Sequence, residues 1–112
     1  MKCVSAVIRR DKFEQLKAAL NTQGFVGMTT YEVNGCGSQH GHLGGAPGDE
    51  TSLELIPKTK VELVVRDAQV ENLINVICGV ARTGRVGDGK IFVTPVEECV
   101  RIRTGERNDL AV

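Results

Sequence analysis

The hydrophobic positions in the first third of the chain predict a strand, a helix and a second strand. Residues 3–8 form a short, largely β-branched apolar run that ends at charged residues, as a buried strand does. Asp11 can cap a helix, whose apolar residues recur at helical spacing until Gly24 ends it. That stripe consists of Phe13, Leu16, Ala19 and Leu20. Residues 25–33 return to a β-like pattern.

The second half of the chain repeats this order. Residues 61–65 predict a strand, Asp67 a helix cap, and residues 91–93 a closing strand. The apolar stripe of the helix between these strands consists of Val70, Leu73, Ile74, Ile77 and Ala81. Two β-α-β units in tandem predict an α+β, ferredoxin-like fold, in which a four-stranded antiparallel sheet carries two helices on one face. Residues 1–112 would form a single domain.

The second face of such a sheet has no helix to cover it. The predicted strands are rich in valine and isoleucine, so leaving this face in water would expose apolar side chains. Identical subunits can cover one another's faces. We therefore expect a homo-oligomer.

Residues 35–55 separate the two halves. They include six glycines and show no apolar periodicity. So long a segment without a regular pattern is uncommon in a small domain unless it carries a function. We interpret it as a flexible recognition or sensing loop, with plain disorder as the alternative.

Residues 82–103 combine glycines and cations in a way that no packed core requires. Glycines at 84, 87 and 89 allow the backbone to turn its N–H groups toward one point. The cations of this segment are Arg82, Arg85, Lys90, Arg101 and Arg103. The combination suits a polyphosphate. It is not a Walker P-loop, because Lys90 continues into the strand-like residues 90–93 and does not open a helix.

The composition restricts the class of protein. The 14 basic and 14 acidic residues balance, so we expect no nucleic-acid partner. No motif places a Ser-His-Asp or Cys-His set, which favours a binding protein over an enzyme. No apolar run resembles a membrane span or a signal peptide, so we expect a cytoplasmic protein. The four cysteines lack metal-site spacing, and Cys3 and Cys78 are predicted to be small core side chains.

Several stretches of the chain carry recognisable motifs: residues 27–42, residues 57–62, residues 81–93, which read ARTGRVGDGKIFV, and residues 101–106, which read RIRTGE. They resemble the corresponding stretches of the PII signal-transduction proteins, the trimeric nitrogen and carbon sensors. Because these stretches are distributed along the chain, the resemblance covers nearly all of it.

The resemblance implies a homotrimer that binds adenine nucleotide in clefts between subunits. The family's T-loop corresponds to residues 35–55, its B-loop to residues 82–90 and its C-terminal loop to residues 101–112. The B-loop of one subunit would face the C-terminal loop of the next. The residues implied to contact ATP or ADP are Thr29, Gly35, Gly37, Ser38, Glu62, Thr83, Gly87, Asp88, Gly89, Lys90, Arg101 and Arg103.

The resemblance also implies a second effector, 2-oxoglutarate, which chelates a Mg²⁺ ion on the ATP phosphates. Gln39 would contact this metal and Lys58 the dicarboxylate, with Gly37, Ser38 and Gly41 beside them. A dicarboxylate next to a triphosphate is stable only if a divalent cation and fixed positive groups offset the repulsion. Effector binding would therefore distinguish ATP from ADP and set the conformation of the T-loop, which would bind or release a target protein.

The T-loop departs from the family pattern at its modification sites. Thr51 stands where many members carry a uridylylated tyrosine, and Asp49 where others carry a phosphorylated serine. We therefore expect no known modification. Ser38 replaces a basic residue that is common in the family, which would retune ATP binding.

The same loop suggests an alternative effector. Cys36, His40 and His42 lie within one short stretch, and thiolate and imidazole groups can hold a metal ion. The alternative is a divergent PII-like nucleotide sensor that answers bicarbonate, a metal ion or the redox state of Cys36.

Overall fold

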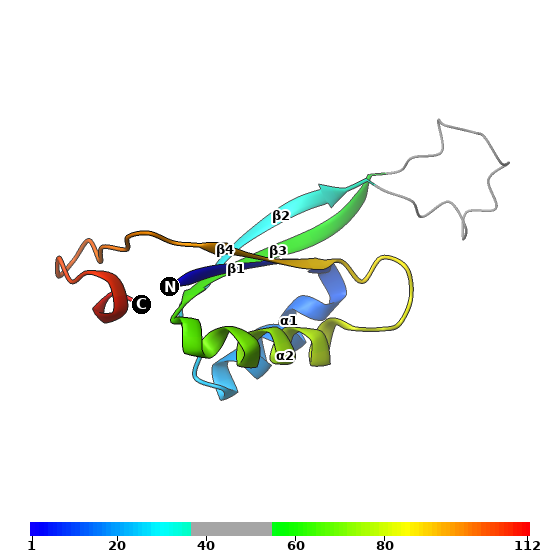
Figure 1. The fold of residues 1–112 in the computed structure, drawn as a ribbon. Coiled ribbons are helices and arrows are strands. Elements are labelled where there is room, and N and C mark those ends of the chain that lie inside the picture. Colours follow the sequence, from blue (N-terminus) through cyan, green and yellow to red (C-terminus); the bar gives the residue numbers. More distant parts are fainter. Residues whose placement is uncertain (37–54) are drawn as a thin grey trace, which may run out of the picture.

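The computed structural model describes residues 1–36 and 55–112. Four strands form one sheet in the order β2-β3-β1-β4, and every neighbouring pair is antiparallel. The strands are β1 (Lys2–Arg9), β2 (Thr29–Gly35), β3 (Ile56–Val65) and β4 (Lys90–Pro95). The helices are α1 (Phe13–Thr22) and α2 (Val70–Ala81), both on one face of the sheet (Figure 1). The predicted ferredoxin-like α+β fold is confirmed.

The core lies between this face and the two helices. Alternate residues of β1 are buried, because strand side chains repeat every two residues. The centre of each helical stripe is buried as well, with the rest of the stripe half-buried, because helix side chains repeat about every 3.6 residues. The largest fully buried side chains are Ile8, Leu16, Leu20, Leu73, Ile77, Val4 and Val61. The opposite, uncovered face presents a mixture of apolar and charged side chains, including Tyr31, Val64 and Phe92, which are exposed in the single chain.

Two strands begin several residues away from the predicted start. β2 begins at Thr29 and not near residue 25, because Phe25 is buried in the connection that follows α1 and pairs with no strand. β3 begins at Ile56, five positions before the apolar run that predicted it. Its first residues include a proline and two lysines, which conceal the strand from a hydrophobicity pattern but still pair with β2.

The predicted helix caps are wrong. Asp11 and Asp67 lie in short 3₁₀ turns that precede the helices, and neither side chain caps one. Asp67 instead binds the amino terminus, with Met1 N and Asp67 Oδ1 2.9 Å apart, and the ammonium of Lys2. The core positions predicted for Cys3 and Cys78 are also wrong. Both thiols are half-buried, Cys3 on the uncovered face and Cys78 in a surface groove.

Candidate functional site

The B-loop is folded around its own carboxylate, Asp88. Gly84, Gly87 and Gly89 have φ values of 86°, 105° and 95°, a region that favours glycine. Asp88 accepts the backbone N–H of Thr83 at 2.8 Å and of Gly84 at 2.9 Å, and also the Thr83 hydroxyl. The hydroxyl bond is the main reason, ahead of the backbone bonds, that the pKa of Asp88 lies far below its usual value. The carboxylate is therefore ionised at neutral pH. It occupies the N–H of Thr83 and that of Gly84, one of the three glycines expected to present N–H groups to a ligand.

Two cations from the sheet hold the loop from outside. Arg9 Nε donates to Asp88 Oδ1 at 3.1 Å, and Arg9 Nη2 donates to the carbonyl of Val86 at 2.8 Å. Lys58 Nζ donates to the carbonyl of Gly87. Arg9 on β1 and Lys58 on β3 are direct cross-strand partners. Sequence reasoning missed Arg9, because its only signal was that charge ended the first apolar run.

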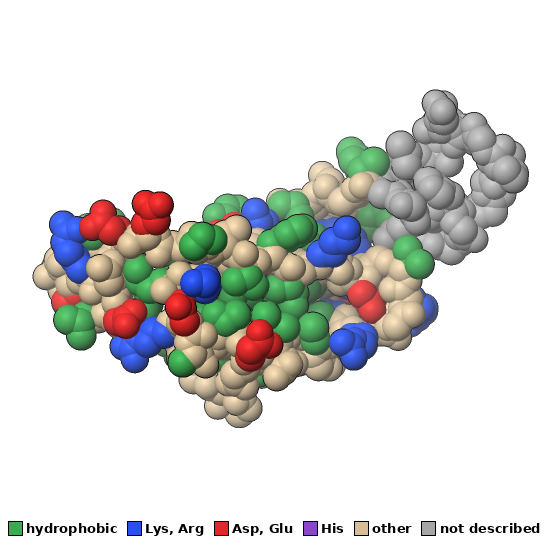
Figure 2. Space-filling model, in the orientation of Figure 1, with side chains coloured by type: hydrophobic (Ala, Val, Ile, Leu, Met, Phe, Trp, Pro, Cys, Tyr) green, Lys and Arg blue, Asp and Glu red, His purple; other side chains and the backbone are tan. Residues whose placement is uncertain are grey.

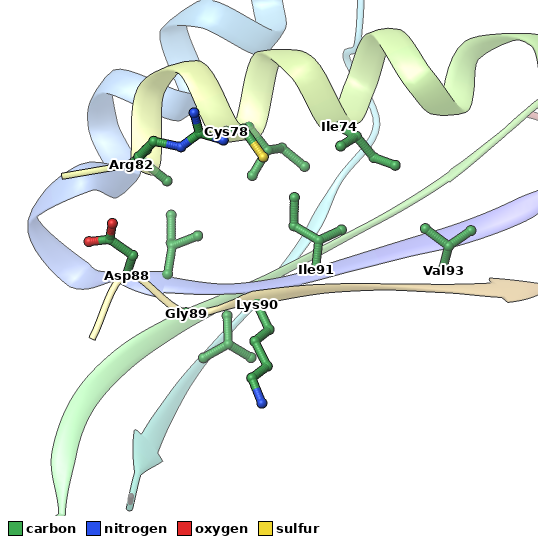
Figure 3. A pocket seen from close by; sticks show the side chains of 12 residues that line it. Ile74, Cys78, Arg82, Asp88, Gly89, Lys90, Ile91 and Val93 are labelled. Atoms are coloured by element: carbon green, nitrogen blue, oxygen red, sulfur yellow. The ribbon is translucent and has the colours of Figure 1, made fainter. Parts of the chain in front are cut away.

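Four cations share the uncovered face near the B-loop. Strand pairing places Arg9 opposite Lys58, and Val7 opposite both Lys60 and Lys90. Lys60 is paired with a carboxylate on its own strand, whereas the side chain of Lys90 makes no hydrogen bond or ion pair with a described residue. Figure 3 shows the side chain of Lys90 directed away from α2. This end of the face thus has an excess of positive charge, which favours an anion.

Lys58 is buried in this region, with an exposed fraction of 7%. Burial, and then the charge of Arg9, lower the pKa of its ammonium below the ordinary 10.5. The ammonium lies beside a cleft of about 460 Å³ lined by Gly35, Cys36, Ile56, Lys58 and residues 85–90. The fixed cations and the loop glycines fit an anion such as a phosphate or carboxylate.

A second cleft, of about 680 Å³, lies at the end of the sheet opposite the B-loop. Thr29, Glu62 and Arg101 line it, together with the last two residues. Arg101 forms an ion pair with Glu106 at 3.0 Å within the C-terminal loop, and Arg103 is exposed. The B-loop and the C-terminal loop lie at opposite ends of the sheet (Figure 1). The six residues of β4 alone span roughly 20 Å between them.

A third, mostly apolar groove of about 410 Å³ runs between α2 and the edge strand β4. Ile74 and Cys78 point from the helix toward Ile91 and Val93 of the strand (Figure 3). Figure 2 shows the corresponding hydrophobic side chains in the centre of this face, with Lys and Arg side chains toward both ends. Its charged lining residues, Arg82, Asp88 and Lys90, all belong to the B-loop.

The chain matches the model of the family described as nitrogen regulatory protein P-II over residues 1–106. It is 51% identical to the nitrogen regulatory protein P-II of Microchaete diplosiphon and 47% identical to that of Azospirillum brasilense. Each comparison covers all 112 residues and the full length of both proteins. The chain belongs to the P-II family.

Membership of this family makes the chain a signalling regulator. The expectation that it is not an enzyme is confirmed on this ground. None of the described helices is long and apolar enough to span a membrane.

The structure divides the predicted P-II nucleotide residues into two groups. One group, at the B-loop end, contains Gly35, Thr83, Gly87, Asp88, Gly89 and Lys90, with the predicted effector residue Lys58 beside it. The other group contains Thr29, Glu62, Arg101 and Arg103. Cys36, a candidate for a metal or redox site, is exposed at the B-loop cleft. Gly37, Ser38, Gln39, His40, Gly41, His42, Asp49 and Thr51 lie outside the described residues.

Proposed function

We propose that the protein is a cytoplasmic, homotrimeric sensor that binds ATP or ADP in the clefts between its subunits. The B-loop of one subunit holds the phosphates, and the C-terminal loop of the next subunit supplies Arg101 and Arg103 from across the cleft. The observation that carries this proposal is the separation of the two groups of predicted residues. Lys90 and Arg101 of one chain are too far apart to contact the same phosphate group. A neighbouring copy removes this difficulty.

The residues at each end suit a nucleotide. The B-loop end offers glycine backbone and an excess of cations, which phosphates require. The other cleft offers the hydroxyl of Thr29, the carboxylate of Glu62 and apolar surface, a combination typical of sites for a small organic molecule. Two such half-sites on one subunit form complete sites when subunits are related by rotation in a closed ring.

Mixed trimers test this arrangement. Lys90→Ala and Arg101→Ala proteins, each alone, should bind ATP much more weakly than wild type. Random trimers of the two variants should recover full affinity at about a quarter of their sites, because such a site needs intact Lys90 from one subunit and intact Arg101 from the next. Equilibrium dialysis with labelled ATP measures that fraction. If mixing restores no site, each site lies within one chain and the proposal is wrong.

The proposed second effector is 2-oxoglutarate, bound together with Mg²⁺ and ATP next to Lys58. Mg²⁺ would neutralise the charge of the triphosphate and the dicarboxylate, Gln39 would contact it, and buried Lys58 would bind the dicarboxylate. Occupancy of the site would change the conformation of residues 35–55 and thereby the binding of a target protein.

Isothermal titration tests this second step. We expect 2-oxoglutarate to bind only when ATP and Mg²⁺ are both present, and not with ADP. If nucleotide binds but 2-oxoglutarate never does, the effector is another small molecule. A response to bicarbonate, to a metal ion or to oxidation of Cys36 would then identify it.

A further inference from the structure

Side chains supply the hydrogen bonds that fix residues 83–88. Asp88 binds the start of the loop through two backbone N–H groups and one hydroxyl. This internal network closes the loop on itself but does not attach it to the sheet. Attachment comes from Arg9 and Lys58, which donate to the loop from β1 and β3.

These two cations form an unfavourable pair. Like charges directly opposite each other in an antiparallel sheet repel, and the charge of Arg9 lowers the pKa of Lys58. The acceptors of the loop offset this repulsion: one carboxylate and two carbonyls lie above the pair. Like charges placed directly opposite each other are unfavourable for folding, and such unfavourable pairs are expected mainly where a site has a function.

The two cations hold the loop differently. Lys58 donates to a single backbone carbonyl, which an incoming anion can replace as a partner. Arg9 uses its planar guanidinium to bridge a charged carboxylate and a carbonyl, so its attachment does not depend on the partner of Lys58. The exposed fractions of the Arg9 and Asp88 side chains are 29% and 24%, so water screens their ion pair only in part.

We propose that Arg9 is a positioning residue of the nucleotide site. Through Asp88 it holds the B-loop against the sheet in the conformation that receives phosphate, and it makes no contact with the nucleotide itself. The inference rests on the proposed nucleotide function and adds to it a residue that neither the sequence pattern nor the resemblance identified.

The first experiment needs no nucleotide. In Arg9→Gln protein, we expect the Thr83 and Gly84 amides, which donate to Asp88, to exchange with solvent at least about tenfold faster than in wild type. Arg10→Gln is the matched control, because Arg10 is exposed and makes no side-chain hydrogen bond or ion pair with a described residue. Equal exchange in wild type and Arg9→Gln would overturn the proposal.

The second experiment measures ATP affinity in a double-mutant cycle. Arg9→Gln should raise the Kd about tenfold in the wild-type background but no more than about threefold in an Asp88→Asn background, because the partner through which it acts is already lost. Arg9→Lys, which keeps the charge but cannot bridge both acceptors, should lie between wild type and Arg9→Gln. Equal losses in both backgrounds would mean that Arg9 contacts the nucleotide directly, and would overturn the positioning role.

The two experiments separate failure of this inference from failure of the proposed function. If wild type and Arg10→Gln bind neither ATP nor ADP, the nucleotide function is wrong, and with it the role of Arg9 in that site. The exchange rates then still decide whether Arg9 holds the loop. If both proteins bind nucleotide and Arg9→Gln binds equally well, only the positioning role is wrong. Circular dichroism of each variant, compared with wild type, confirms that the sheet is retained.

Discussion

Gly89 occupies the tightest backbone approach of the B-loop, and its replacement by alanine tests the local geometry. A Cβ at this position would lie 1.7 Å from the carbonyl oxygen of Val7 and 2.8 Å from its carbonyl carbon. The residue also has a φ of 95°, which side chains rarely adopt. Gly84 has a φ of 86° but nothing within 4 Å of its added Cβ. Gly84→Ala is therefore a control that carries the backbone strain without the clash.

The expected losses follow from these two terms. Backbone strain costs about 1–2 kcal/mol in either variant. Relief of the clash at Gly89 requires β4 to move away from β1 where Lys90 pairs with Val7, with the loss of one or two hydrogen bonds at about 1 kcal/mol each. Gly89→Ala should thus lower the free energy of unfolding by about 2–4 kcal/mol and Gly84→Ala by about 1–2 kcal/mol.

Urea denaturation followed by circular dichroism measures both losses. All proteins are compared at one concentration, since subunit association contributes to stability. In thermal unfolding, each kcal/mol corresponds to a shift of roughly 4 °C for a domain of this size. The reasoning fails if Gly89→Ala is as stable as Gly84→Ala, because the close contact with Val7 would then cost nothing.

Three further predictions concern the core, the buried cation and the thiols. Leu73 is fully buried, so Leu73→Ala should lower the free energy of unfolding by about 2–5 kcal/mol in urea, and a loss under about 1 kcal/mol would contradict the packing. The pKa of Lys58 is lowered mainly by burial, so the unfolded chain binds more protons just below pH 10.5. The stability of wild type relative to Lys58→Met should therefore rise as the pH increases toward 10.5, and a flat difference would argue against a buried ammonium. Burial, and then Glu62, raise the pKa of the Cys3 thiol, so iodoacetamide should alkylate exposed Cys36 first, as followed by mass spectrometry; the reverse order would refute this.

The distribution of charge explains how a neutral chain can bind an anion. Basic and acidic residues balance in number, yet strand pairing gathers Arg9, Lys58, Lys60 and Lys90 at one end of the uncovered face. The B-loop places one carboxylate, Asp88, beside this cluster. That carboxylate binds two N–H groups of its own loop and the guanidinium of Arg9, so it does not neutralise the lysines. Positive charge therefore remains for a ligand.

The sequence by itself determined the elements and their order. Periods of two and of about 3.6 residues reveal which face of each element is apolar, and these patterns predicted both helices and the ferredoxin-like sheet. The glycines of the B-loop predicted a backbone free to turn there, and all three have positive φ, a region that favours glycine. The motifs around residues 81–93 and 101–106 also sufficed to predict the family.

Only the tertiary structure decided which partners the charged side chains take. Asp11 and Asp67 matched a capping pattern, but neither side chain caps a helix, and Asp67 binds the amino terminus of the chain. Arg9 and Lys58 meet through strand register, and together they reach a loop that is distant in sequence. The spacing of apolar residues indicates which side of a helix or strand is buried. The partner of a charged side chain depends instead on which strands pair and in which register. For the same reason, the sequence pattern alone could not separate the B-loop from Arg101, which the length of β4 keeps at the far end of the subunit.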